Sequence, residues 1–249
     1  MRITAKILVA VFFVTLLTAI RASGHTSIVV ARTSEFAIIA ADSKVTWTDA
    51  PAGSACKIGR VGGMLFAIGG LAVSRDTGWN AMQAASSAAS TARGAVRRAV
   101  DAFERDAQRE LPRAFENLRV KDPAEFDKWT PRTSLEILFV GIEKNSVILI
   151  HSKYKFNSEH KTLKVISESC PGSCKDGPVQ IAVLGRRAAV DRRLRDVAFV
   201  DPSPSGIATL VTSLVELEIA DVPEEVGGPI DVVRLNRDRS MSTINRGAC

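Results

Sequence analysis

Two apolar segments near the start of the chain limit most strongly what it can fold into. Residues 27–32 and 36–42 are rich in Ile, Val and Ala, and the short sequence Thr-Ser-Glu separates them. Segments of this kind on either side of a turn predict an antiparallel hairpin. Because apolar residues occupy both faces of these strands, the sheet that contains them must be covered on both sides.

The rest of the chain alternates between groups of strands and groups of helices. Helices that come in blocks, rather than after every strand, favour helices layered on antiparallel sheets over a doubly wound fold. We therefore predict an α+β fold in which two sheets pack together and helices cover both outer faces. Further strands are expected at 57–61, 64–69, 134–143, 147–153, 163–167, 179–184 and, as the last, 230–235; helices are expected within 75–128 and at 187–199 and 205–220.

The long helical region carries its own internal signals. Val96, Val100, Phe103 and Ala107 recur at helical spacing and predict a buried stripe. Pro112 and Pro123 are expected to mark helix boundaries or kinks, since proline removes a backbone donor.

Residues 1–24 have the composition of a secretory signal. A short basic start precedes an apolar run over 7–20, and Ala22-Ser23-Gly24 supplies the small residues that a signal peptidase reads. The apolar run is shorter than the ~20 residues that a membrane-spanning helix needs. The sequence predicts a cleaved signal, with an uncleaved anchor or a buried helix as alternatives. One domain would then cover 25–249, exported to the periplasm or secreted, with no membrane attachment after cleavage.

The composition of the chain indicates which classes of partner and cofactor are not expected. The formal net charge of +6 includes three basic residues of the leader, and the chain has one tyrosine, so a nucleic-acid partner is not expected. Cys170 and Cys174 flank a Pro-Gly-Ser turn and predict a disulfide in an oxidising compartment. The alternative, a metal site, would need ligands that the three histidines do not supply, so neither metal nor cofactor is expected. Cys56 and Cys249 either pair or stay free.

Removal of the leader would bring Thr26 close to a new N-terminus. The hydroxyl of an N-terminal threonine can attack a carbonyl while its own α-amine accepts the proton. Cleavage after Gly24 would leave His25 ahead of Thr26. A second trimming step, or self-cleavage of the His25–Thr26 bond, would then be needed to free the amine.

The hairpins suggest which residues accompany Thr26. If the first turn centres on Ser34, Asp42 lies opposite Thr26. If Gly62 and Gly63 form the second turn, Lys57 lies close to Gly69. With the two hairpins side by side, a lysine could promote ionisation of the hydroxyl, an aspartate could orient the lysine, and a glycine N–H could stabilise an oxyanion.

At these residues the chain resembles the proteasome β-subunit family of N-terminal-nucleophile hydrolases. The resemblance implies Thr26 as nucleophile, Lys57 as activator, Asp42 as its orienter and Gly69 as oxyanion donor, with Lys44 where the family commonly has arginine. It also implies a four-layer αββα sandwich and, from the family's ring assemblies, a homo-oligomer. The segments that carry it are 26–30, 36–44, 57–61, 66–72 and 226–233.

The chain also departs from the family pattern. Arg186 stands in the place of a supporting serine, and Pro223 and Val226 replace an acid and a serine before the late Gly-Gly. Three hypotheses follow. The first is an exported threonine hydrolase that cleaves a peptide or a small amide. The second is a catalytically silent relative that serves assembly or binding, and the third is a secreted or membrane-tethered interaction protein on an unrelated fold.

Overall fold

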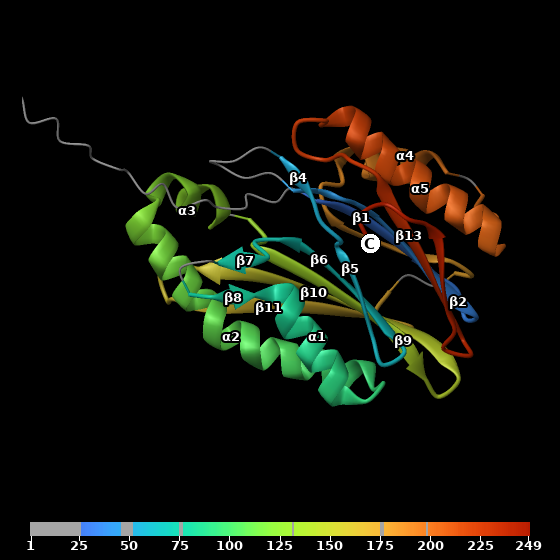
Figure 1. The fold of residues 1–249 in the computed structure, drawn as a ribbon, viewed down its shortest axis with the longest axis horizontal. Coiled ribbons are helices and arrows are strands. Elements are labelled where there is room, and N and C mark those ends of the chain that lie inside the picture. The colour runs from blue at the N-terminus through green and yellow to red at the C-terminus, as the bar shows by residue number, and fades with distance from the viewer. Residues whose placement is uncertain (1–25, 46–51, 75–76, 131, 175–176, 198) are drawn as a thin grey trace, which may run out of the picture.

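The computed structural model describes residues 26–45, 52–74, 77–130, 132–174, 177–197 and 199–249 (Figure 1). The predicted signal and His25 lie outside these residues. Two five-stranded antiparallel sheets and two groups of helices make up the described part, so the predicted α+β class is confirmed.

The first sheet contains the predicted N-terminal hairpin at its centre. Its strands, in spatial order, are β12 (Gln180–Gly185), β1 (Ser27–Arg32), β2 (Phe36–Asp42), β13 (Ile230–Asn236) and β14 (Met241–Asn245). The strand β14 was not predicted. It is short, largely polar and at the edge of the sheet, so it lacks the apolar signal of a buried strand.

The second sheet contains the Gly-Gly hairpin at one edge. Its strands are β11 (Thr162–Cys170), β10 (Ser146–Asn157), β9 (Leu135–Glu143), β6 (Met64–Gly70) and β5 (Ile58–Val61). Two short pairs accompany the sheets: β3 (Lys44–Val45) with β4 (Gly53–Ser54), and β7 (Val73–Ser74) with β8 (Trp79–Asn80).

Three of the helices in the described part of the chain begin at a residue whose side chain caps the first turn. The helices of that part are α1 (Ala81–Ala92), α2 (Val96–Lys121), α3 (Pro123–Trp129), α4 (Ala188–Asp196) and α5 (Pro204–Asp221). The side chains of Asn80, Asp122 and Ser203 accept bonds from backbone N–H groups of the first turns of α1, α3 and α5. The predicted helical region therefore starts later than residue 75, because Trp79 and Asn80 belong to β8. Pro123 opens α3 as expected, whereas Pro112 lies inside α2.

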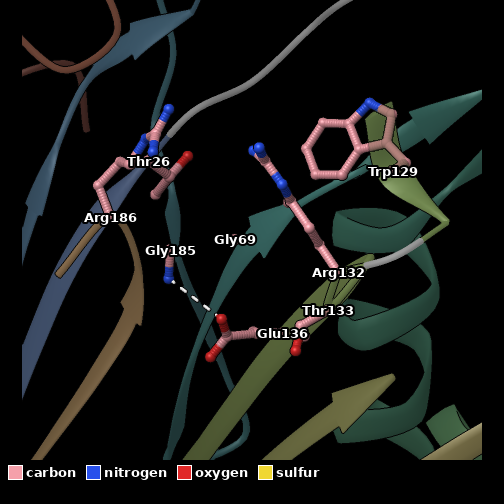
Figure 2. Close-up of a pocket in the computed structure, with 9 residues that line it drawn as sticks. Thr26, Gly69, Trp129, Arg132, Thr133, Glu136, Gly185 and Arg186 are labelled. Atoms are coloured by element: carbon pink, nitrogen blue, oxygen red, sulfur yellow. Dashed lines mark hydrogen bonds between the residues drawn. The ribbon is translucent and has the colours of Figure 1, made fainter. Parts of the chain in front are cut away.

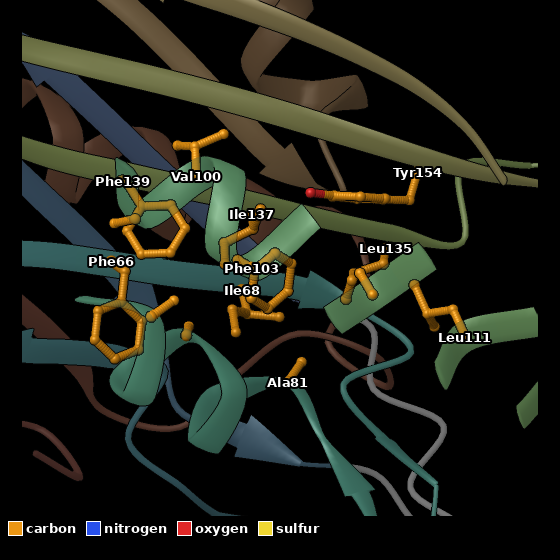
Figure 3. Packing of buried hydrophobic residues seen from close by; sticks show 14 of the residues in the cluster. Phe66, Ile68, Ala81, Val100, Phe103, Leu111, Leu135, Ile137, Phe139 and Tyr154 are labelled. Carbon is orange, nitrogen blue, oxygen red and sulfur yellow. The ribbon is translucent and has the colours of Figure 1, made fainter. Parts of the chain in front are cut away.

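Three apolar clusters hold these elements together. One lies between α1, α2 and the second sheet, and includes Phe103, which makes edge-to-face contacts with Phe139 and Tyr154 (Figure 3). The predicted stripe on α2 is buried there. A second cluster lies between the two sheets, and a third lies between the first sheet and α5. Alternate residues of β1 and β2 enter the second and third clusters, which confirms that this hairpin is covered on both faces.

The register of the first hairpin differs from the prediction by one residue. Ile28 pairs with Ala41, so continuing the ladder places Ser27, and not Thr26, opposite Asp42. The predicted Thr26–Asp42 pairing is therefore wrong. A shift of one residue exchanges the two faces of a strand, so it changes which backbone groups surround Asp42.

The turn itself explains the shift. Thr33 N–H donates to the Phe36 carbonyl at 2.8 Å, and the Thr33 hydroxyl accepts from the N–H groups of Glu35 and Phe36, each at 3.1 Å. These bonds centre the turn between Ser34 and Glu35 instead of on Ser34. In the second hairpin, Gly62 and Gly63 both have positive φ, and Ile58 pairs with Ala67, as the predicted two-residue turn requires.

Candidate functional site

Asp42 and Lys57 meet in the space between the two sheets. Asp42 ends β2 in the first sheet, and Lys57 directly precedes β5 in the second. The Lys57 Nζ lies 2.9 Å from Asp42 Oδ1 and 2.8 Å from Oδ2. The Asp42 side chain is fully buried, and 10% of the Lys57 side chain is exposed. The structure therefore brings the two hairpins together at this pair.

Asp42 also fixes the backbone beside Thr26. Its Oδ1 accepts from Ser27 N–H at 2.8 Å, and its Oδ2 accepts from Gly227 N–H at 3.3 Å. A carboxylate with several charged or backbone donors is a strong hydrogen-bonding centre. The carboxylate thus ties Lys57, the start of β1 and the loop before β13 to one point.

Burial shifts the pKa values of both Lys57 and Asp42. It lowers the pKa of Lys57 below its ordinary value, although the neighbouring Asp42 charge and hydrogen bonds oppose the shift. Burial likewise raises the pKa of Asp42, against the bonds from Lys57, Ser27 and Gly227. The ammonium of a lysine with lowered pKa holds its proton less tightly than that of an exposed lysine, so the charge of Lys57 depends on Asp42 beside it.

Thr26 is held by its backbone from the side opposite Asp42. Its carbonyl accepts from Arg186 N–H at 2.7 Å. Gly185 has a φ of +75°, and a Cβ added there would lie 2.0 Å from the Thr26 oxygen. Only glycine can occupy this position without displacing Thr26. Among the described residues, no hydrogen bond joins the Thr26 hydroxyl to Lys57; Ser27 and Asp42 connect them.

A pocket with a volume of about 200 Å³ opens at Thr26 (Figure 2). Gly69, the expected oxyanion donor, lines the same pocket, so the structure brings these two predicted residues together. Lys44 does not line it: its Nζ donates to the Pro223 carbonyl at 2.5 Å. The lining residues are Thr26, Gly69, Gly70, Trp129, Arg132, Thr133, Glu136, Gly185 and Arg186.

Glu136 belongs to the site and His151 contacts it, although the sequence analysis singled out neither residue. Glu136 lies opposite Gly69 in the β6–β9 pairing and lines the pocket. Its Oε2 lies 2.8 Å from His151 Nε2, and its Oε1 accepts from Gly185 N–H at 3.4 Å. A charged residue within the apolar sequence of β9 was the available signal, since carboxylates are seldom buried without a partner.

Arg186 also lines the pocket beside Thr26. It occupies the place of the supporting serine in the proteasome pattern, and its guanidinium forms an ion pair with Glu225. The pair is partly exposed: 36% of the Arg186 side chain and 24% of the Glu225 side chain are accessible. This part of the pocket is therefore charged where the family pattern has a serine.

Both cysteine pairs are disulfides. Cys170–Cys174 closes the predicted small ring, and Cys56–Cys249 joins residues 193 positions apart. The second bridge lies directly before Lys57. Asp231 holds the C-terminal half of this bridge in place, because its carboxylate accepts from the backbone N–H groups of residues 247, 248 and 249 at 2.6 to 3.0 Å.

The described residues contain no group of three or more His, Cys, Asp or Glu side chains that could hold a metal ion. Within those same ranges, no helix is both long enough and apolar enough to cross a membrane.

Comparison with known proteins identifies similar folds. No protein-family model and no curated protein matches the chain. Anbu (ancestral beta-subunit) from Yersinia bercovieri is 15% identical, with a TM-score of 0.51, over 89% of this chain and 87% of that one. An Anbu (Gly-1) mutant from Hyphomicrobium sp. strain MC1 is 18% identical, with a TM-score of 0.50, over 88% and 87%. The described chain thus shares the fold of these two Anbu proteins.

Proposed function

We propose that this protein is an exported N-terminal threonine hydrolase that cleaves a peptide or small amide bond. One observation carries the proposal: the buried Lys57–Asp42 pair is fastened to the backbone directly after Thr26, and Thr26 shares a pocket with Gly69. This arrangement brings a nucleophile, a cation and a glycine backbone to one place.

The chemistry requires a free amine on Thr26. The α-amine, with an ordinary pKa of about 7.7–8.0, takes the hydroxyl proton as the oxygen attacks the substrate carbonyl. Lys57 stabilises the developing negative charge, and Asp42 keeps the lysine in position. The Gly69 N–H binds the oxyanion, the amine passes its proton to the leaving group, and water then hydrolyses the ester on Thr26.

We also propose a four-layer fold, a homo-oligomeric assembly and an exported location for this protein. The order of the three apolar clusters supports an αββα sandwich, with α1 and α2 outside one sheet and α5 outside the other. One of the similar structures is named as an ancestral beta-subunit, which supports a homo-oligomer. Two disulfides support export to an oxidising compartment after cleavage of a signal at residues 1–24.

A specific observation favours the alternative, a catalytically silent relative that serves assembly or binding. Arg186, Pro223 and Val226 stand where the proteasome pattern has supporting polar residues. The Arg186–Glu225 ion pair lies beside the Thr26 backbone instead. If those polar residues are needed to orient the amine, the fold persists without hydrolysis.

Two measurements separate these functions. Intact mass and N-terminal sequencing of the exported protein should give a chain that starts at Thr26. A peptide epoxyketone, which needs both a hydroxyl and an α-amine to react, should then label that residue. Thr26→Ala should fold and lose the label, whereas Thr212→Ala, on α5, should keep it. A stable chain that starts at His25 and takes no label would establish the silent relative instead.

A further inference from the structure

Among the residues that the structure describes, one charged side chain of the pocket has no hydrogen-bond or ion-pair partner. Arg132 lies between α3 and β9, and its backbone N–H donates to the Trp129 carbonyl at 3.2 Å. Its side chain extends into the pocket between Thr26 and Trp129 (Figure 2). Among the described residues, none accepts a hydrogen bond from the Arg132 guanidinium or forms an ion pair with it.

The other charged groups of the pocket are already engaged. Arg186 is paired with Glu225. Both oxygens of Glu136 have protein partners, since Oε2 contacts His151 and Oε1 accepts from Gly185. Among the charged side chains that line the pocket, Arg132 is therefore the one whose hydrogen-bond donors are unused. An anionic group of a ligand would complement it.

We propose that Arg132 binds a carboxylate of the substrate and so sets the specificity of the hydrolase. This inference rests on the proposed function and names its substrate class: amides with a carboxylate close to the bond that is cleaved. A guanidinium offers parallel N–H groups that fit the two oxygens of a carboxylate. Trp129, whose ring nitrogen donates to Glu125 at 2.7 Å, adds a fixed apolar wall against which methylene groups can pack.

The carboxylate could belong to an acidic side chain or to the end of a peptide. Binding of three small ligands distinguishes these sources: N-acetylglutamate amide, its neutral isostere N-acetylglutamine amide, and N-acetylalanine, whose only carboxylate is terminal. Titration of the Thr26→Ala protein keeps the measurement independent of any hydrolysis. We expect one of the two acids to bind about tenfold more tightly than the neutral ligand, as a partly solvated bidentate pair allows.

Variants at residue 132 then assign the effect. Arg132→Gln in the same background should remove the preference for the acid, and Arg132→Lys should retain part of it. Arg113→Gln, which removes an exposed arginine of α2 outside the pocket, should leave the preference unchanged. Equal binding of acid and isostere, or a preference that survives Arg132→Gln, would overturn the inference. Tighter binding of N-acetyllysine amide would also overturn it, because Glu136 would then dominate the pocket.

Hydrolysis with native Thr26 separates failure of the inference from failure of the proposed function. For paired glutamate and glutamine amides, we expect kcat/KM to favour the acid by about tenfold and to lose this ratio in Arg132→Gln. Hydrolysis of both amides at equal rates would refute the carboxylate preference while leaving the hydrolase intact. Binding preference without any hydrolysis would refute the hydrolase while leaving the carboxylate site intact.

Discussion

The two sides of Thr26 are built in different ways. On one side, Asp42 and Lys57 are buried and bonded to each other, and Asp42 also holds two backbone N–H groups. On the other side, the charges of the pocket wall, including Arg132 and Arg186, lie partly in solvent. Solvent screens the open side, whereas the buried side has no such compensation. The open side can therefore change charge with little effect on folding, and the buried side cannot.

Removal of the Asp42 charge should have the largest effect on stability. Asp42→Asn leaves the Lys57 ammonium buried without its counter-charge, and breaking such a pair costs about 3–5 kcal/mol. Urea unfolding should show this loss, and hydrolysis should fall with it. Asp238→Asn, at an exposed turn, is the matched control and should change the free energy of unfolding by about 0.5 kcal/mol or less.

The folded fraction of Asp42→Asn should also show a changed dependence of its hydrolysis rate on pH. In the mechanism that we propose, hydrolysis needs the charged form of Lys57, so we expect activity to decline as pH rises through the lysine pKa. The Asp42 charge raises that pKa against the effect of burial. Loss of the charge should therefore move the alkaline limb of the pH–rate profile to lower pH. An unchanged limb would show that Lys57 does not act through its charge.

Gly185→Ala should have the second largest effect, because it combines a left-handed backbone with direct overlap on Thr26. We expect a loss of about 1–3 kcal/mol in unfolding free energy, together with a loss of activity. Gly78→Ala is a sharp control, since Gly78 has a φ of +70° and open space around it. It should lose only the backbone contribution of about 1 kcal/mol and keep full activity. Equal activity in both variants would contradict a positioning role for Gly185.

Loss of the Arg186–Glu225 pair should have the smallest effect on stability. Glu225→Gln removes a partly exposed ion pair, for which about 0.2–1 kcal/mol is typical. The measurement is again urea unfolding, compared directly with Asp42→Asn. A loss as large as that of Asp42→Asn would show that the two sides do not differ in the way described above.

Much of the fold could be predicted from the sequence because its strands are long, apolar and separated by strong turn residues. The bounds of β1 and β2 agree with the prediction for this reason. The register could not be predicted as reliably, because the Thr33 hydroxyl closes the turn and moves its centre by half a residue. Periodicity does not report bonds of that kind.

Some residues of the candidate site could be predicted from the sequence, and others could not. Asp42 and Lys57 could each be placed at the end of a predictable hairpin, but their contact required the assumption that the two hairpins lie side by side. Lys44 was expected at the site but contacts the Pro223 carbonyl, since it lies in the short strand β3 beyond the end of β2. Glu136 and His151 meet only through strand pairing between β9 and β10, which no local pattern specifies. The catalytic roles of Thr26, Lys57 and Gly69 remain proposals.

The bonds around Asp42 also order events during synthesis of the chain. Asp42 and Lys57 lie close together in the sequence, but the N–H of Gly227 and the cysteine that secures the Lys57 segment come nearly two hundred residues later. Contacts so distant in sequence can form only after the intervening chain is made. A nascent chain therefore lacks the complete set of bonds around Asp42 until the loop before β13 and the C-terminal cysteine have been made. If Thr26 is the nucleophile that we propose, it would become reactive only in the finished chain.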